Sequence, residues 1–277
     1  MDDVRLDHPR GGLAIVTGAN LTVAAGEVVV IVGAAGVGTS RLVAAALGEH
    51  PAAAGTISVL GHDVGKLRRS SLRLLRRRVG IVPQELCLLD DRTVQLNVML
   101  PLEIDGIPRS ISIARAADVL ARVGLETEAG MQLDELAPSA RQRVAVARAL
   151  VRDPDVVFAD HPTSMQDAAG AELVCTAIAQ TARMGAACVL LGRDPALRAI
   201  AEREGWRQLV LIQGALLPIG EVLLEGKTIE ELLVDLVSAP TPIRPVAPAP
   251  APAPAAADHG IPNLVQFPIS ARANGAA

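Results

Sequence analysis

The sequence has almost no aromatic residues, with one Trp, two Phe and no Tyr among 277 residues. Without aromatic rings, a core has to be built from Ala, Val, Leu and Ile, which fill parallel sheets and the helices that cover them. Cysteine is scarce as well, and Cys87, Cys175 and Cys188 form neither a disulfide framework nor a C-x-x-C metal pair. These shortages point to an aliphatic α/β protein and away from a small disulfide- or zinc-stabilised domain.

The sequence also lacks long apolar runs and a strong excess of either charge. No stretch reaches the ~18 uncharged apolar residues of a membrane span, and the start at Met1 shows no secretory signal. With 26 Lys and Arg against 30 Asp and Glu, the net charge is −4, which disfavours a nucleic-acid binder that relies on bulk charge. We therefore expect a cytoplasmic protein with no nucleic-acid partner.

The composition changes sharply near residue 240, where Pro and Ala begin to alternate. This pattern favours polyproline II and cannot form a packed core. It predicts a folded domain over residues 1–238 and a disordered Pro/Ala-rich tail over residues 239–277. Residues 260–270 include Phe267 and are compatible with a docking peptide, although a plain disordered tail is the simpler interpretation.

Before the tail, short apolar runs alternate with stretches of helical spacing. The β-branched run at 26–33 is typical of a buried strand. Shorter strands are expected at 56–60, 155–160 and 187–192. Helical spacing predicts helices at 40–48, where Gly48 ends the helix, 113–123 and 140–151. Strands separated by helices indicate a parallel α/β sheet.

One glycine-rich segment stands between the first predicted strand and the first predicted helix. It reads Gly33-Ala34-Ala35-Gly36-Val37-Gly38-Thr39-Ser40. This order matches the phosphate loop G-x-x-x-x-G-K-S/T at every position except the lysine, where Thr39 stands. In such a loop, backbone N–H groups converge on an anion at a helix N-terminus. For this segment alone, a tight strand-to-helix turn without a ligand is the alternative interpretation.

Further motifs follow in an order that resembles the ATP-binding subunit of ABC transporters, from about Val4 to Gly220. Five segments correspond to motifs of this family, in the family's order. They are a Q-loop at 82–84, a signature with its helix at 134–150, a Walker B motif at 156–163, a D-loop at 164–167 and an H-switch at 192–195. The stretch from Arg76 to Leu102 is most similar to the FtsE cell-division branch and its lipoprotein-export relatives.

The resemblance implies a P-loop NTPase fold of the ABC type. Its RecA-like mixed-sheet core would come from residues near 1–85 and 151–225, and its helical lobe from about 86–150. The implied cofactors are ATP, held by residues 33–40, Gln84 and Asp160, and Mg²⁺, held by Ser40, Gln84 and Asp160. The implied partners are an integral-membrane, FtsX-like permease and a second ABC subunit, in a homodimer or a heterodimer. Such a subunit lies peripherally on the inner face of the cytoplasmic membrane.

Several positions depart from the pattern of ATP-hydrolysing family members. Thr39 replaces the lysine that neutralises phosphate charge, His161 replaces the glutamate that orients water, and Arg193 replaces the histidine that senses the γ-phosphate. The signature Ser-Gly-Gly-Gln is Ala137-Pro138-Ser139-Ala140 here, and a proline has no N–H to offer a phosphate. The adenine-stacking aromatic expected near residues 8–10 is replaced by His8-Pro9-Arg10.

These departures lead to two alternative functions. The leading prediction is a pseudo-ATPase adaptor that acts with a permease in cell division or export, with weak or absent ATP binding. Loss of three charge-stabilising groups slows turnover by on the order of 10⁴ or more, even after a discount for non-additivity. The alternative is an active ATPase in which His161 is the general base and Arg193 stabilises the γ-phosphate. This alternative leaves the altered signature unexplained.

A dense basic stretch precedes the Q-loop. Its cations are Lys66, Arg68, Arg69, Arg73, Arg76, Arg77 and Arg78. Leucines interrupt this stretch, and it has no aromatic residue for base stacking. We interpret it as the solvated face of a helix, with proximity to an anionic lipid surface as the second interpretation.

Overall fold

The computed structural model describes residues 1–7, 14–33, 39–212 and 214–220, and the structural statements below concern these residues. The predicted tail at 239–277 lies outside them. Residues 8–10 and residues 34–38 of the glycine-rich segment also lie outside them.

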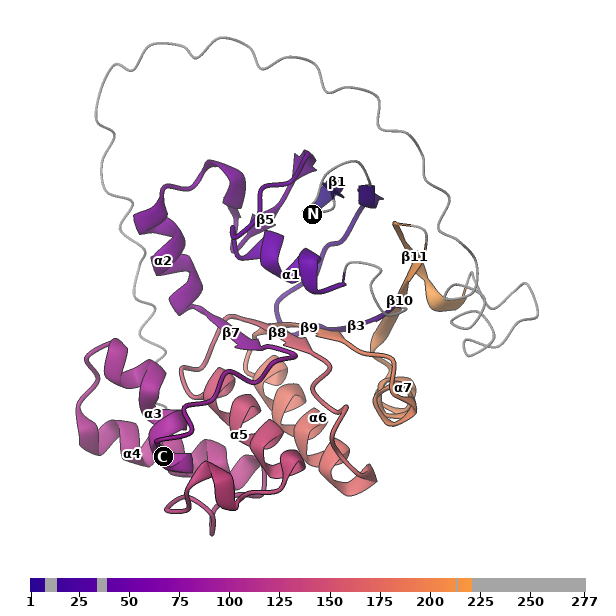
Figure 1. Cartoon of the computed structure of the whole chain (residues 1–277). Coiled ribbons are helices and arrows are strands. Elements are labelled where there is room, and N and C mark those ends of the chain that lie inside the picture. Colours follow the sequence, from indigo (N-terminus) through magenta and orange to yellow (C-terminus); the bar gives the residue numbers. More distant parts are fainter. Residues whose placement is uncertain (8–13, 34–38, 213, 221–277) are drawn as a thin grey trace, which may run out of the picture. The chain divides into compact units, whose positions relative to one another are not determined.

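A six-stranded sheet forms the centre of this part of the chain (Figure 1). Its strand order is β11-β10-β3-β9-β8-β7. The strands are β3 Val28–Gly33, β7 Val79–Val82, β8 Val156–Asp160, β9 Ala187–Leu191, β10 Arg207–Ile212 and β11 Ala215–Pro218. Strands β10, β3, β9, β8 and β7 run parallel, whereas β11 is antiparallel to β10. The predicted mixed sheet is therefore confirmed.

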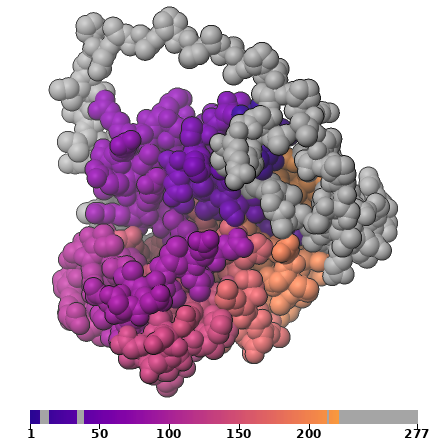
Figure 2. Space-filling model, viewed as in Figure 1, coloured from indigo at the N-terminus to yellow at the C-terminus, as the bar shows by residue number. Residues whose placement is uncertain are grey.

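Helices cover both faces of this sheet, and others lie beside it. They are α1 Thr39–Ala46, α2 Arg69–Arg77, α3 Val94–Ile104, α4 Arg109–Arg122, α5 Pro138–Leu150, α6 Ala168–Arg183 and α7 Pro195–Arg203. Figure 1 shows α1 and α2 on one face, α5, α6 and α7 on the other, and α3 and α4 beside the sheet. The space-filling view shows the same two layers, one in purple and the other in magenta to orange (Figure 2).

The side chains of β3 divide the hydrophobic core in two. Val29 and Ile31 belong to a cluster with the buried residues of α1, whereas Val30 and Val32 belong to a cluster with those of α5 and α6. Successive strand residues point to opposite faces, so each face of β3 meets its own helical layer. This explains why the run from Val28 to Gly33 is apolar without alternation.

The ends of two helices agree with the sequence-based expectations. Gly48 follows α1 in the left-handed conformation, with φ +69°, which glycine adopts without steric cost. Pro138 occupies the first turn of α5, where a missing N–H breaks no helical hydrogen bond. The helices expected at 113–123 and 140–151 are observed as α4 and α5, each beginning a few residues earlier.

The strand expected at 56–60 was wrong as a single element. The chain there forms β4 Ala54–Thr56 and β5 Ser58–Val59, which belong to different sheets. β4 joins β1 Asp2–Asp7 and β2 Ala14–Ala19 in an antiparallel sheet, and β5 pairs with β6 His62–Asp63. Between them Ile57 is buried in the core, so the chain changes its pairing partner at that residue.

The helices α3 and α4 pack on α5 and form a helical lobe beside the sheet (Figure 1). The hydroxyl of Thr93 accepts a hydrogen bond from Leu96 N and caps α3. The fully buried Asn97 donates to the carbonyls of Leu89, Arg92 and Thr93, and its Oδ1 accepts from Leu89 N. These bonds hold the segment that leads from β7 into the lobe.

The interpretation of the basic stretch as a solvated helix face was correct only in part. Arg76 donates to the carbonyl of Leu47 at 2.9 Å. Arg77 forms an ion pair with Asp105 at 3.2 Å, and Arg78 forms one with Asp155 at 2.8 Å. The C-terminal arginines of α2 therefore attach the helix to its neighbours, because α2 ends against the sheet and the helical lobe.

Among the described helices, none is long and apolar enough to span a bilayer.

Candidate functional site

The register of the parallel strands brings four strand ends to one edge of the sheet. Val82 pairs with Ala159, Asp160 pairs with Leu191, and Leu191 also pairs with Ile31 of β3. Ligands of open α/β sheets bind beyond the carboxyl ends of the strands. Among the described residues, Ser40, Gln84, Asp160, His161 and Arg193 lie at or after the ends of β3, β7, β8 and β9, so these sequence-predicted site residues belong to this edge.

At this edge the Ser40 hydroxyl donates a 2.5 Å hydrogen bond to Oδ2 of Asp160. Asp160 ends β8 and is 7% exposed, and its other oxygen, Oδ1, is buried and has no hydrogen-bond partner in the described part of the chain. An unpartnered buried carboxylate oxygen is costly unless a cation or donor reaches it. Hydroxyl and carboxylate oxygens are ligands of Mg²⁺. Ser40 and Asp160 therefore fit a magnesium ion, which would supply positive charge next to a phosphate.

The residue after Asp160 is held firmly by its backbone. His161 has φ +53°, its N–H donates to Leu191 O at 2.7 Å, and its carbonyl accepts from Gln142 and Ser164. Its Nε2 lies 3.9 Å from the free Oδ1 of Asp160. The imidazole is 23% exposed. A neutral histidine at this distance makes no ion pair, but a protonated one would attract the carboxylate.

The buried Gln142 is a site residue that the sequence reasoning missed. Its Nε2 donates to His161 O at 2.8 Å and to Ser164 Oγ at 3.1 Å. Its Oε1 accepts from Met165 N and from Gln166 Nε2. Gln142 lies on α5, so it connects the signature helix to the segment after β8. The only local signal was a glutamine among small and apolar residues on a helix face.

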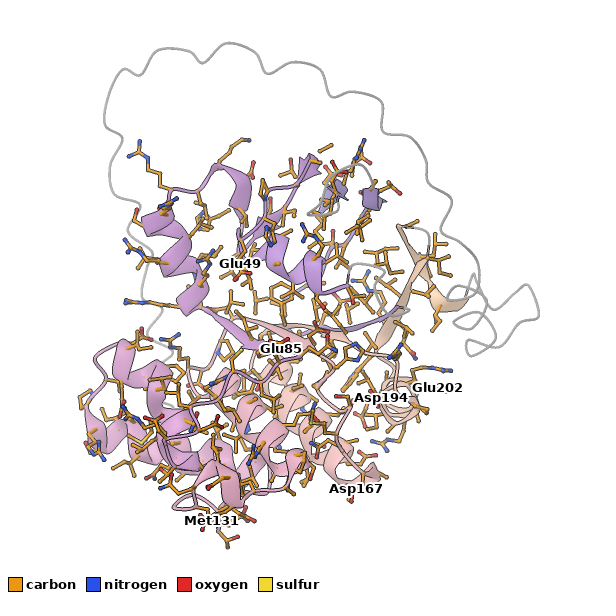
Figure 3. The ribbon with its side chains drawn as sticks, viewed as in Figure 1. Glu49, Glu85, Met131, Asp167, Asp194 and Glu202 are labelled. Carbon is orange, nitrogen blue, oxygen red and sulfur yellow. The ribbon has the colours of Figure 1, made fainter. Side chains whose placement is uncertain are left out.

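A second polar connection joins the segment after β8 to the segment after β9. Thr163 Oγ1 donates to Asp194 Oδ2 at 2.7 Å, and Asp194 Oδ1 accepts from Leu197 N, which caps α7. Asp167 caps α6 in the same way through Gly170 N at 2.8 Å. Figure 3 shows Asp194 and Asp167 at the starts of these two helices. Both aspartates are therefore engaged in capping.

The remaining predicted residues that the structure describes have fewer contacts. Thr39 begins α1, and Gln84 follows β7 with an exposed side chain. Arg193 is exposed and makes no ion pair with another described residue. Pro138 begins α5, and its N-cap residue Ala137 has no side-chain capping bond. Residues 34–38, which complete the predicted phosphate loop, lie outside the described residues.

A strand and a helix joined by a glycine-rich sequence, with Ser40 bonded to the acidic end of another parallel strand, define a P-loop nucleotide-binding protein. The family model for ABC transporters matches residues 16–164. The chain belongs to this family, and its fold is that of an ABC ATPase. Members of the family bind ATP with Mg²⁺.

Two relatives and one solved structure illustrate the similarity. The methionine import ATP-binding protein MetN of Caulobacter vibrioides is 36% identical over 234 residues, which are 84% of this chain and 67% of MetN. The macrolide export ATP-binding/permease protein MacB of Shigella flexneri is 34% identical, over 73% of this chain and 32% of MacB. The dimeric structure of MJ0796, a bacterial ABC transporter cassette, has a TM-score of 0.70 at 25% identity, over 78% of this chain and 94% of that one.

The chain spans only part of its longer relatives, from 67% of the Caulobacter MetN to 55% of a Brucella MetN and 32% of MacB. These proteins are named for methionine import and macrolide export. They do not support the finer prediction that the chain belongs to the FtsE cell-division branch.

Proposed function

We propose that this chain is a pseudo-ATPase adaptor, an ABC-type subunit that docks on a membrane permease and has lost ATP hydrolysis. A weak ATP site remains in the proposal, formed by residues 33–40, Gln84 and Asp160, with Ser40, Gln84 and Asp160 as the Mg²⁺ ligands. The folded part is assigned to residues 1–238, and residues 239–277 are assigned to a tail.

The surroundings of the Ser40–Asp160 pair carry this proposal. The pair keeps the oxygen ligands for Mg²⁺, but the adjacent residues are Thr39 and His161, where ATP-hydrolysing relatives have lysine and glutamate. A charge-assisted hydrogen bond to a phosphate is worth ~1.5–3 kcal/mol, so the missing lysine weakens binding by about 10- to 100-fold. A missing group that stabilises transition-state charge costs ~2.7–4 kcal/mol more.

The start of α5 supports the same conclusion from the other side of a dimer. In this family, the ATP bound by one subunit is covered by the signature of the second subunit. Here the signature segment offers Pro138, which has no N–H, and Ala137, which has no polar side chain. In a homodimer both sites would therefore carry both defects, and in a heterodimer a complete partner subunit would fully rescue neither site.

We assign the permease contact to the segment from Gln84 to Pro101. Arg148 on α5 holds this segment by donating to the carbonyls of Leu86 and Cys87 at 2.5 and 2.6 Å. Cys87 and Leu89 are exposed, Leu89 by 37%. A fixed backbone that presents exposed side chains is suited to receive a cytoplasmic loop of a polytopic protein.

The relatives favour a transport permease as the partner. The FtsX-like permease and the role in cell division depended on the stretch from Arg76 to Leu102 alone. The relatives named above are an importer subunit and an exporter. We therefore propose a solute transporter, located at the inner face of the cytoplasmic membrane, as the complex that contains this chain.

Phosphate release from Mg-ATP by the purified full chain tests the loss of hydrolysis. We expect wild type and His161→Ala to match the buffer blank. A variant that also restores the signature, Thr39→Lys/His161→Glu/Ala137→Ser/Pro138→Gly, should rise above it. Release by wild type that disappears in His161→Ala would overturn the proposal.

That outcome would establish the alternative function, an ATPase with a retuned site. One observation favours this alternative, because the 3.9 Å separation between His161 Nε2 and Asp160 Oδ1 keeps the imidazole near the proposed Mg²⁺ ligands. Arg193 would then supply the positive charge that Thr39 lacks. The changed signature at 137–140 argues against it.

Affinity capture from membranes tests the adaptor role separately. The full chain and a variant lacking residues 240–277 are compared under the same detergent. We expect both to recover a polytopic membrane protein, because the proposed contact lies between Gln84 and Pro101. Recovery of soluble proteins alone would contradict the adaptor role.

A further inference from the structure

We propose that the outward face of α2 binds the anionic phospholipid headgroups of a membrane surface. Arg69 and Arg73 lie one turn apart on this helix, and Arg68 is its N-cap residue. All three are exposed. Within the described ranges, none of their side chains makes a hydrogen bond or an ion pair. We call these residues, together with the exposed Leu74, the α2 basic face.

The other arginines of the same helix show what a structural role looks like. Arg76 donates to the carbonyl of Leu47, just after α1, and Arg77 forms an ion pair with Asp105 of the helical lobe. Leu75 is 1% exposed and packs into the core. The attachment of α2 to the body is therefore complete without Arg68, Arg69 and Arg73.

The α2 basic face is also unfavourable for the helix by itself. The N-terminal end of a helix carries partial positive charge, yet the first turn of α2 has no acidic residue and begins with Arg69. Arg69 and Arg73 are like charges at i and i+4, which repel each other. The N-cap residue Arg68 makes no side-chain capping bond. An external anion would relieve all three effects at once.

Lipid phosphate fits this face better than nucleic acid does. Guanidinium groups bind phosphate in a bidentate way, and Leu74, which is 39% exposed, adds an apolar contact beside Arg73. Of the aromatic residues in the described part, Phe158 is buried in β8 and Trp206 packs against the core cluster of α5 and α6, so the α2 basic face offers no ring for base stacking. The net charge of −4 also disfavours a polyanion that wraps the whole protein.

The position of α2 agrees with the proposed membrane complex. The Arg77–Asp105 ion pair ties the C-terminal end of α2 to the end of α3, and α3 follows the segment assigned to the permease contact. The inference thus rests on the proposed location at a permease, but it does not depend on the loss of hydrolysis. Headgroup contacts would add to the permease contact and orient the subunit against the bilayer.

Vesicle flotation without nucleotide and without permease tests this inference. The full chain is mixed with vesicles of phosphatidylcholine alone or of phosphatidylcholine with phosphatidylglycerol. Each cation near an anionic surface strengthens binding about fivefold. We expect the chain to float only with the anionic vesicles, to be released by salt, and to bind about 30-fold more weakly as Arg69→Gln/Arg73→Gln.

The matched control is Arg115→Gln/Arg183→Gln, which removes the same charge from exposed arginines on α4 and α6. This control has the same net charge as Arg69→Gln/Arg73→Gln, so long-range attraction to the vesicles is reduced equally in both variants. Because the control keeps the α2 basic face, it should bind the anionic vesicles within about twofold of wild type. Arg68 is the N-cap residue and precedes the helix, so Arg68→Gln tests the face without a change inside α2. Its affinity for the anionic vesicles should fall about fivefold.

Three results would overturn the inference. They are equal flotation with neutral and anionic vesicles, binding by Arg69→Gln/Arg73→Gln that equals the control, and tighter binding to a short DNA duplex than to the anionic vesicles. None of them bears on phosphate release or on capture of the permease, so the proposed function would stand or fall separately.

Discussion

Ser40 and Asp160 are 120 positions apart in the sequence, and the hydroxyl of Ser40 donates a 2.5 Å hydrogen bond to the carboxylate of Asp160. The bond joins the first turn of α1 to the end of β8 at the carboxyl edge of the sheet. The second carboxylate oxygen of Asp160 is buried without a hydrogen-bond partner among the described residues. This edge is therefore arranged for a cation, with Thr39 next to Ser40 and His161 next to Asp160.

Thr39→Lys should tighten Mg-ATP binding by about 10- to 100-fold, because a lysine at this position adds a charge-assisted hydrogen bond to the phosphates. Titration with a fluorescent ATP analogue measures the change. Thr39→Ser is the control, since it keeps a hydroxyl and adds no charge. Equal affinities for wild type and Thr39→Lys would show that the threonine does not limit binding.

Gln142→Ala should destabilise the fold by ~1–3 kcal/mol, because it leaves buried groups around His161 and Met165 without their partners. Urea unfolding followed by circular dichroism gives the free energy of unfolding. Gln95→Ala on α3 is the control, since the Gln95 side chain makes no hydrogen bond to a described residue. A loss no larger than that of the control would mean that the Gln142 bonds are not needed for stability.

Asp105→Ala should cost ~1–3 kcal/mol of unfolding free energy, because Arg152 then remains largely buried without its carboxylate. Arg152 Nε lies 2.7 Å from Asp105 Oδ2, and its side chain is 19% exposed. Burial lowers the pKa of Arg152, and Asp105 opposes that shift. The hydrogen bond from Arg152 to Pro101 O remains in the variant and limits the loss. The exposed Asp118→Ala on α4 should change stability by less than ~0.5 kcal/mol in the same unfolding assay.

Stability should fall at alkaline pH because of two buried thiols. Burial raises the pKa of Cys175 and of Cys188 from 9.0 to about 12. The folded-state pKa of each thiol exceeds its unfolded value. The stabilisation of the fold by the protonated thiols is therefore complete below about pH 9 and is lost as the pH rises toward 12. Each thiol should remove ~1.4 kcal/mol per pH unit in that window. Urea unfolding between pH 8 and pH 11 should show a shallower decline for Cys188→Ala, and equal slopes would contradict the assignment.

Gly80→Ala should be strongly destabilising, by more than ~2 kcal/mol, because β7 and α5 approach each other closely at this residue. A methyl group on Gly80 would lie 2.4 Å from the carbonyl oxygen of Ala149, whose backbone cannot yield without moving α5. Gly130→Ala is the matched control, since no atom lies within 4 Å of its added methyl. Thermal unfolding of the two variants measures the contrast, and similar melting temperatures would mean that α5 can shift away from the sheet.

Local patterns predicted the scaffold well. The β-branched run before Gly33 fixed a buried strand, and Gly48 marked the end of α1, because each pattern depends on neighbours in sequence. The strand at 56–60 failed because the chain changes pairing partner at Ile57, and such a change leaves no periodic trace. The sequence also suggested that Ser40 and Asp160 belong to one site, through the motifs that contain them.

Tertiary polar contacts could not be predicted in the same way. Gln142 reaches a carbonyl 19 residues away, and Arg152 reaches one 51 residues away. Nothing near these residues in sequence distinguishes them from exposed polar residues of a helix or loop. The basic stretch shows the same limit, because Arg76 and Arg73 look alike in sequence, yet only Arg76 meets a carbonyl of the body among the described residues.

Thr39, Pro138, His161 and Arg193 lie outside both hydrophobic clusters of the core. A substitution at any of these positions therefore removes no apolar contact from the packed core. The chemistry of this edge can vary while the hydrophobic interior that supports it stays the same.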